Sequence, residues 1–140
     1  MNTRLAFGQR FFDTWTPRAL AALRLVTAYL YLQQGTAKLL HVPHLAVFDQ
    51  LSVLSLIGFA EMLETVGSLL LVLGLFTRPV AFILSGEMAV AYFVVHARLG
   101  HFFAPALNHG ELAVLYCFIF LFLATAGGGS WSIDAHRALK

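Results

Sequence analysis

The sequence predicts an all-α integral membrane protein, a single domain whose helices form a four-helix bundle. Hydrophobic residues make up 59% of its 140 residues and charged residues only 11%, whereas soluble domains carry about 25% charged residues. A soluble domain of this size could not hide so much apolar surface, because small domains bury the smallest share of their surface. The apolar residues also gather in four stretches, each close to the ~20 residues that cross a bilayer.

The first helix is expected at about residues 19–36, with Pro17 immediately before it. Basic and aromatic residues precede this helix, and they are Arg4, Phe7, Arg10, Phe11, Phe12, Trp15 and Arg18. This long aromatic lead-in is unlike a cleaved signal peptide, so we predict a retained helix with an interfacial segment before it.

The second helix is expected at about residues 51–76 and the third at about 79–97. The short connection through Thr77 and Arg78 makes them an antiparallel hairpin. The fourth helix is expected at about residues 109–126, before three consecutive glycines. The single domain then covers residues 1–140.

Basic residues predict the orientation. Those near the two termini and in the tight turn are Arg4, Arg10, Arg18, Arg78, Arg137 and Lys140, whereas the other side carries Lys38 and Arg98. The positive-inside rule therefore places both termini in the cytoplasm of a multi-pass inner-membrane protein. No basic run suggests a nucleic-acid partner. The lipid bilayer is the expected partner, with a homo-oligomer as a further possibility.

Four glutamates interrupt the apolar stretches: Glu61, Glu64, Glu87 and Glu111. A charge at the centre of a membrane helix costs roughly 2.5–3.5 kcal/mol on insertion scales, so such groups pair or function. By depth, Glu61 and Glu111 lie in the outer half, and Glu64 and Glu87 lie near the middle. Lys38, His96, Asn108 and His109 also lie toward the outer side, while Arg24 lies in the inner half. We therefore expect a polar pocket that opens outward. The alternative is that these groups only pair within the bundle, with Arg24 bound to Glu87 or Glu64.

Other site classes lack their motifs. The histidines show no HExxH or Glu-x-x-His spacing, so no metal site is assigned. Cys117 is the only cysteine and lies in an apolar stretch, so redox chemistry would require a borrowed cofactor or a partner.

Several short stretches resemble the DoxX family of small four-helix membrane proteins. They are Leu23-Arg24-Leu25 with Gln34-Gly35 and Lys38, Glu64 with Gly67, Leu73 to Arg78, Ala91-Tyr92-Phe93 with His96, Asn108 to Ala113, and Gly127 to Asp134. The resemblance implies a four-helix membrane fold. Relatives are linked to a thiosulfate:quinone oxidoreductase subunit and to oxidative-stress complexes, so it also implies partner subunits in a redox complex. Glu61 and Glu87 match no family motif.

The leading hypothesis is a membrane subunit of a redox system that engages a quinone and a small outer-side electron donor. Glu64, Glu111 and His96 would be the catalytic proton carriers. The ligand-binding residues would be Arg24, Lys38, Glu61, Glu87, Asn108 and His109. The alternative is a non-enzymatic membrane scaffold, or a carrier of a small molecule or metal, in which the same residues stabilise the bundle or bind a solute.

Overall fold

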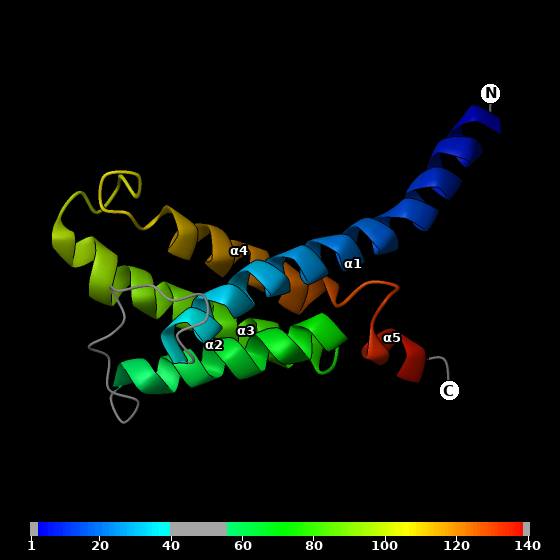
Figure 1. The fold of residues 1–140 in the computed structure, drawn as a ribbon. Coiled ribbons are helices and arrows are strands. Elements are labelled where there is room, and N and C mark those ends of the chain that lie inside the picture. Colours follow the sequence, from blue (N-terminus) through cyan, green and yellow to red (C-terminus); the bar gives the residue numbers. More distant parts are fainter. Residues whose placement is uncertain (1–2, 40–55, 139–140) are drawn as a thin grey trace.

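The computed structural model describes the backbone of residues 3–39 and 56–138, and the side chains of residues 8–37 and 58–138. Every regular element in these ranges is helical, which confirms the all-α prediction (Figure 1). The helices are α1 (Thr3–Leu39), α2 (Leu56–Leu73), α3 (Thr77–Ala91), α4 (Glu111–Ala126) and α5 (Ile133–Arg137). A π-helical turn (Tyr92–His96) and a 3-10 turn (Ala97–Leu99) continue α3.

Helix α1 is longer than the sequence predicts. It runs without a break through Pro17 for 37 residues, about 55 Å at 1.5 Å per residue. Proline removes one intrahelical hydrogen bond, but the remaining bonds of the helix still form. The hydrocarbon core of a bilayer is only about 30 Å thick, so α1 extends beyond it.

The other helix ends also differ from expectation, for local reasons. Helix α4 begins at Glu111 rather than 109, because His109 has a left-handed φ of 58° that no α-helix accommodates. Helix α3 begins at Thr77 rather than 79, because Asp134 accepts hydrogen bonds from the amides of Phe76 and Thr77.

The predicted hairpin of α2 and α3 is present, and Figure 1 shows the two helices side by side. Its turn passes through Gly74, whose φ is 66°, and a Cβ on this glycine would lie 2.7 Å from Cα of Ser132. Helix α1 packs mainly on α2, and α3 packs mainly on α4, with further contacts between α2 and α3 and between α1 and α4. The short α5 lies at the end where α2 meets α3.

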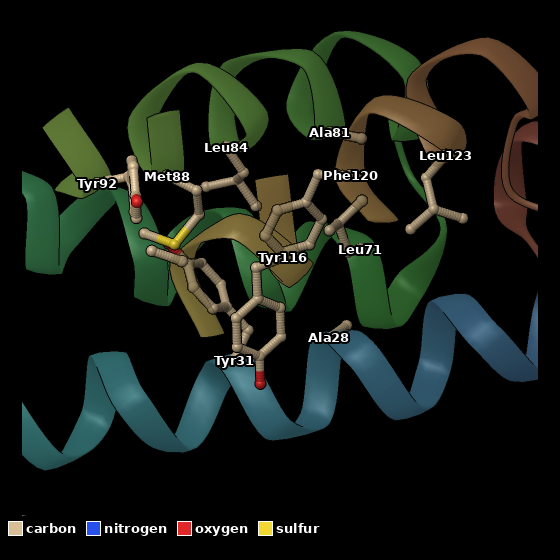
Figure 2. Close-up of a cluster of buried hydrophobic side chains, with 11 residues drawn as sticks. Ala28, Tyr31, Leu71, Ala81, Leu84, Met88, Tyr92, Tyr116, Phe120 and Leu123 are labelled. Carbon is tan, nitrogen blue, oxygen red and sulfur yellow. The ribbon is translucent and has the colours of Figure 1, made fainter. Parts of the chain in front are cut away.

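The core contains a cluster of aromatic rings between α1 and α4. Figure 2 shows Tyr31, Tyr116 and Phe120 within this core. The ring centroid of Tyr31 lies 5.0 Å from that of Tyr116 and 4.9 Å from that of Phe120. Such edge and offset contacts contribute about 0.5–1.5 kcal/mol per pair beyond their buried area. The tyrosines thus form a rigid wall deep between the helices.

Helix α2 has its polar residues inside and its apolar residues outside. Its buried face includes Glu61, Glu64 and Ser68. Its exposed face consists of Phe59, Met62, Val66, Leu69 and Leu73. This is the reverse of a helix in a water-soluble protein, and it suits a helix whose outer face contacts lipid.

By length and composition, one helical stretch within the described residues, Thr77–Leu99, is long and apolar enough to cross a membrane. Helix α4 is also apolar but shorter, at 16 residues.

Candidate functional site

A cavity of about 400 Å³ lies between the helices at the end of the bundle opposite α5. Residues of α1, α2, α4 and the α3 region line it, and they are Tyr31, Gln34, Glu64, Met88, Ala91, Val95, His96, His109, Leu112, Ala113 and Tyr116. The walls are therefore aromatic and aliphatic, with one carboxylate and two imidazoles among them. Ligand sites usually have this composition, with a few polar groups in an apolar cleft of about 300–1,000 Å³.

Three of the residues predicted for the site meet in this cavity: Glu64, His96 and His109. Glu64 is only 3% exposed and reaches the cavity from the polar face of α2. His96 is half-buried, and His109 is exposed. The cavity is therefore lined both by the buried carboxylate of Glu64 and by the water-accessible imidazole of His109.

His96 ends the π-helical turn that follows α3. Turns of this kind occur often at functional sites, because the extra residue redirects the side chains. The Nδ1 atom of His96 lies 3.1 Å from the backbone carbonyl oxygen of Asn108. A carbonyl only accepts hydrogen bonds, so Nδ1 carries a proton and donates it, and Nε2 of the neutral ring is the basic nitrogen.

Asn108 holds the loop beside the cavity and does not line it. Its side chain is 1% exposed, and its Oδ1 accepts a hydrogen bond of 3.0 Å from the amide of Gly110. Its Nδ2 donates to the hydroxyl of Tyr92 and to the carbonyls of Gly100 and His101, each at 3.4 Å. Asn108 therefore positions the carbonyl that orients His96.

Glu87 and Glu61 lie in the same half of the protein but do not line the cavity. The hydroxyl of Tyr31 donates to Oε2 of Glu87 over 3.3 Å, which links Glu87 to a cavity wall. Glu61 is 1% exposed. Its Oε1 is buried without a hydrogen-bond partner among the described residues.

Among the remaining residues predicted for the site, Glu111 does not line the cavity. Glu111 is exposed in the first turn of α4. A negative charge at this position stabilises the helix, because the N-terminal end of the helix dipole is positive. The side chain of Lys38 lies outside the described residues. In the described part of the chain, no group of three or more His, Cys, Asp or Glu side chains could hold a metal ion.

Arg24 lies at the other end of the protein. The sequence allowed an ion pair with Glu87 or Glu64, but Arg24 instead donates to backbone carbonyls. Its side chain is fully buried. Nε donates to the carbonyl of Gly128 over 2.8 Å, and Nη1 donates to the carbonyls of Leu71 and, over 2.8 Å, Val72. Nη2 donates to the carbonyl of Trp131. The partners are backbone carbonyls because α2 ends beside Arg24, and its last carbonyls lack helical partners.

Asp134 fastens the same end of the molecule. Its carboxylate accepts hydrogen bonds of 2.9 Å from the amide of Phe76 and 2.7 Å from the amide of Thr77. Burial by itself would raise the pKa of this carboxyl, but the hydrogen bonds from Thr77 and Phe76 and the charge of Arg137 lower the pKa below its ordinary value. Arg24 and Asp134 are thus structural residues at the end of the protein where α5 lies.

Sequence reasoning missed the aromatic walls of the cavity. Tyr31 lies three residues before Gln34 on α1, and Tyr116 lies three residues after Ala113 on α4. The i, i+3 spacing places each pair on one helix face. That signal was visible in the sequence, although many apolar residues share the same spacing.

Comparison with known proteins agrees with this architecture. The DoxX family profile matches residues 19–97. The chain belongs to the DoxX family. It is also 45% identical over 129 residues to an uncharacterized protein of Haemophilus influenzae, with 87% of this chain and 92% of that protein covered. No solved structure matches the chain. DoxX membership, together with the membrane-length helix and the apolar outer face of α2, makes this a membrane-associated protein.

Proposed function

We propose that this DoxX protein is a membrane subunit of a redox system and that it binds a quinone in the cavity. One observation carries the proposal: Glu64, His96 and His109 line the same cavity as the aromatic rings of Tyr31 and Tyr116. A quinone ring needs flat apolar walls and groups that exchange protons with its oxygens. The volume of about 400 Å³ accommodates such a ring.

When bound, the quinone would take up two electrons from a small reduced donor on the outer side, and two protons. The chain's own residues would supply the protons. Glu64 would transfer one from within the cavity, and Nε2 of His96, once protonated, would transfer the other. His109 and Glu111 are both exposed and would return protons from water. Lys38 and Glu87 would adjust the local electrostatic field.

The proposed arrangement in the membrane has four crossing helices, both termini in the cytoplasm and the cavity near the outer face of the inner membrane. The two described chain ends lie at the same end of the bundle (Figure 1). Arg10, Arg18, Arg78 and Arg137 are exposed at that end, and an excess of basic residues is typical of cytoplasmic segments.

A second candidate is a non-enzymatic scaffold or small-molecule carrier. One observation favours it: the hydrogen bonds of His96, Asn108 and Tyr92 hold the loop from Gly100 to Gly110. Polar residues with such structural partners would be needed in a protein without catalysis as well. Under this reading, the cavity stabilises the bundle or binds a solute without electron transfer.

The test is to extract and identify the quinone from protein purified in a mild detergent, by mass spectrometry and ultraviolet absorption. We expect stoichiometric quinone in the unmodified protein. Glu64→Leu and His96→Leu remove every hydrogen-bonding group of these side chains. Each should weaken quinone binding about tenfold, because a lost hydrogen bond in a buried site costs about 1–3 kcal/mol.

His136→Ala is the matched control, since His136 is exposed at the opposite end. It should retain the quinone. Thermal unfolding of each variant separates loss of ligand from loss of structure. Absence of quinone from the unmodified protein, or variants that lose stability but keep their quinone, would favour the scaffold or carrier.

A further inference from the structure

The first four turns of α1 do not pack on the rest of the protein. Figure 1 shows them projecting past the ends of α2, α3 and α4. Residues 9–16 are all exposed, and Ala21 is the first fully buried residue of the described side chains. The contact with the bundle begins at Pro17, whose carbonyl accepts a hydrogen bond of 3.2 Å from the amide of Ser130. The projecting segment therefore has a surface that the fold itself does not use.

This segment is amphipathic. At about 100° per residue, Phe11, Trp15 and Phe12 occupy an arc of about 100° on one side of the helix. The ring centroid of Phe11 lies 5.6 Å from that of Phe12 and 6.1 Å from that of Trp15. Asp13 lies on the opposite side. The three rings form one continuous apolar surface, and all three are exposed.

Two arginines flank this aromatic surface. The guanidinium of Arg18 lies 5.2 Å from the ring centroid of Trp15, which is a cation–π distance. Arg10 is exposed one position before Phe11. Rings beside arginines suit the boundary between acyl chains and anionic headgroups, where tryptophan and arginine are common anchors.

We propose that the segment before Pro17 rests on the surface of an anionic membrane, with its aromatic rings at the level of the headgroups. The position of the segment supports a lipid partner. Ser130 and Ala21 place its base at the end of the bundle where α5 lies. In the proposed arrangement this is the cytoplasmic end, so the first turns of α1 would start where the hydrocarbon ends. Pro17 lacks the amide that would bond one turn back, and a helix bends most easily at such a residue. The segment can therefore incline toward the membrane.

The experiment uses the full chain with a single tryptophan as reporter. Trp131→Phe leaves Trp15 alone, and it keeps the backbone carbonyl of residue 131 that accepts from Arg24. The protein is reconstituted in vesicles of phosphatidylcholine, with and without phosphatidylglycerol. Fluorescence quenching of Trp15 is then measured with brominated acyl chains and, separately, with acrylamide in the water.

With phosphatidylglycerol we expect strong quenching of Trp15 by the brominated lipid and weak quenching by acrylamide. Arg10→Gln should raise the ratio of water-exposed to membrane-sheltered Trp15 about fivefold. The reason is that each basic residue near an anionic surface contributes about 1 kcal/mol to binding. Arg98→Gln is the matched control, since Arg98 is exposed at the far end of the bundle. Arg98→Gln should leave the quenching of Trp15 by brominated lipid and by acrylamide unchanged.

Three outcomes would overturn the proposal. The first is Trp15 open to acrylamide in every vesicle, which would leave the segment in water for a protein partner. The second is Trp15 sheltered from acrylamide but untouched by brominated lipid, which would point to a second copy of the chain. The third is that Trp15 is sheltered equally well in vesicles without phosphatidylglycerol and in the Arg10→Gln variant. This result would show that the segment does not need anionic lipid. None of these outcomes depends on a quinone.

Discussion

Replacement of Arg24 by methionine should destabilise the protein more than any change of a surface arginine. The side chain is fully buried and donates to four backbone carbonyls, those of Leu71, Val72, Gly128 and Trp131. Methionine fills a similar volume but donates no hydrogen bond. Arg24→Met therefore tests whether this guanidinium joins the C-terminus of α2 to the segment that follows α4.

The magnitude follows from the carbonyls left behind. The carbonyl of Leu71 keeps a partner, because it also accepts from the amide of Gly74 over 3.1 Å. The other three lose their donor, and each unsatisfied buried group costs about 1–3 kcal/mol. The hydrogen bonds to the carbonyls of Val72 and Trp131 are only partly buried, so the low end of the range applies. We expect a loss of about 3 kcal/mol, which is about 150-fold in the unfolding equilibrium constant.

The assay is reversible unfolding in mixed micelles of a mild detergent and sodium dodecyl sulfate. Arg24→Lys keeps the charge but not the planar fork of donors, so it should recover only part of the loss. Arg18→Gln, on the exposed side of the same helix, should stay within about 0.5 kcal/mol of the unmodified protein. An Arg24→Met variant as stable as Arg18→Gln would refute the reasoning.

Two further predictions concern a helix contact and a helix cap. Gly35→Ala should destabilise the protein by about 1–3 kcal/mol, because the added Cβ would lie 2.9 Å from the backbone nitrogen of Thr65; unfolding in the same micelles measures it. The free energy of unfolding should fall as the pH drops below 3.8, because the pKa of Asp134 is lowered by folding and its contribution is lost as the folded-state carboxyl takes up its proton. Asp134→Asn should be less stable at neutral pH, by about 1 kcal/mol or less given its partial exposure, and should lose this part of the pH dependence.

Each of these predictions has its own control. Gly86→Ala meets nothing within 4 Å, and alanine favours a helix over glycine by about 1 kcal/mol, so it should be neutral or stabilising. If Gly35→Ala were also neutral or stabilising, this result would contradict the close contact of α1 and α2 at Gly35. Asp13→Asn changes an exposed carboxylate in the projecting segment. An acid response equal to that of Asp134→Asn would show that the cap at Asp134 is not the cause.

The candidate site was partly visible in the sequence. His96 and His109 could be assigned to one end of the bundle and Glu64 to a depth near its middle, because helical rise converts sequence position into depth. Depth alone does not give direction around the helix axis. Asn108 was expected to contact the ligand from the start of the fourth helix, but it lies in the loop before α4, and its side chain faces that loop and Tyr92.

The sequence by itself determined that this chain is an all-helical membrane protein and that two of its helices form a tight hairpin. Composition and hydrophobic patterning carry these properties, because long apolar stretches are needed to span a bilayer and charged groups are costly within it. Only the tertiary structure decided which polar groups meet. Helix rotation and the left-handed turn at His109 set those contacts, and the four carbonyls around Arg24 come from segments more than forty residues apart. Such convergence depends on how the helices pack, which no local pattern in the chain specifies.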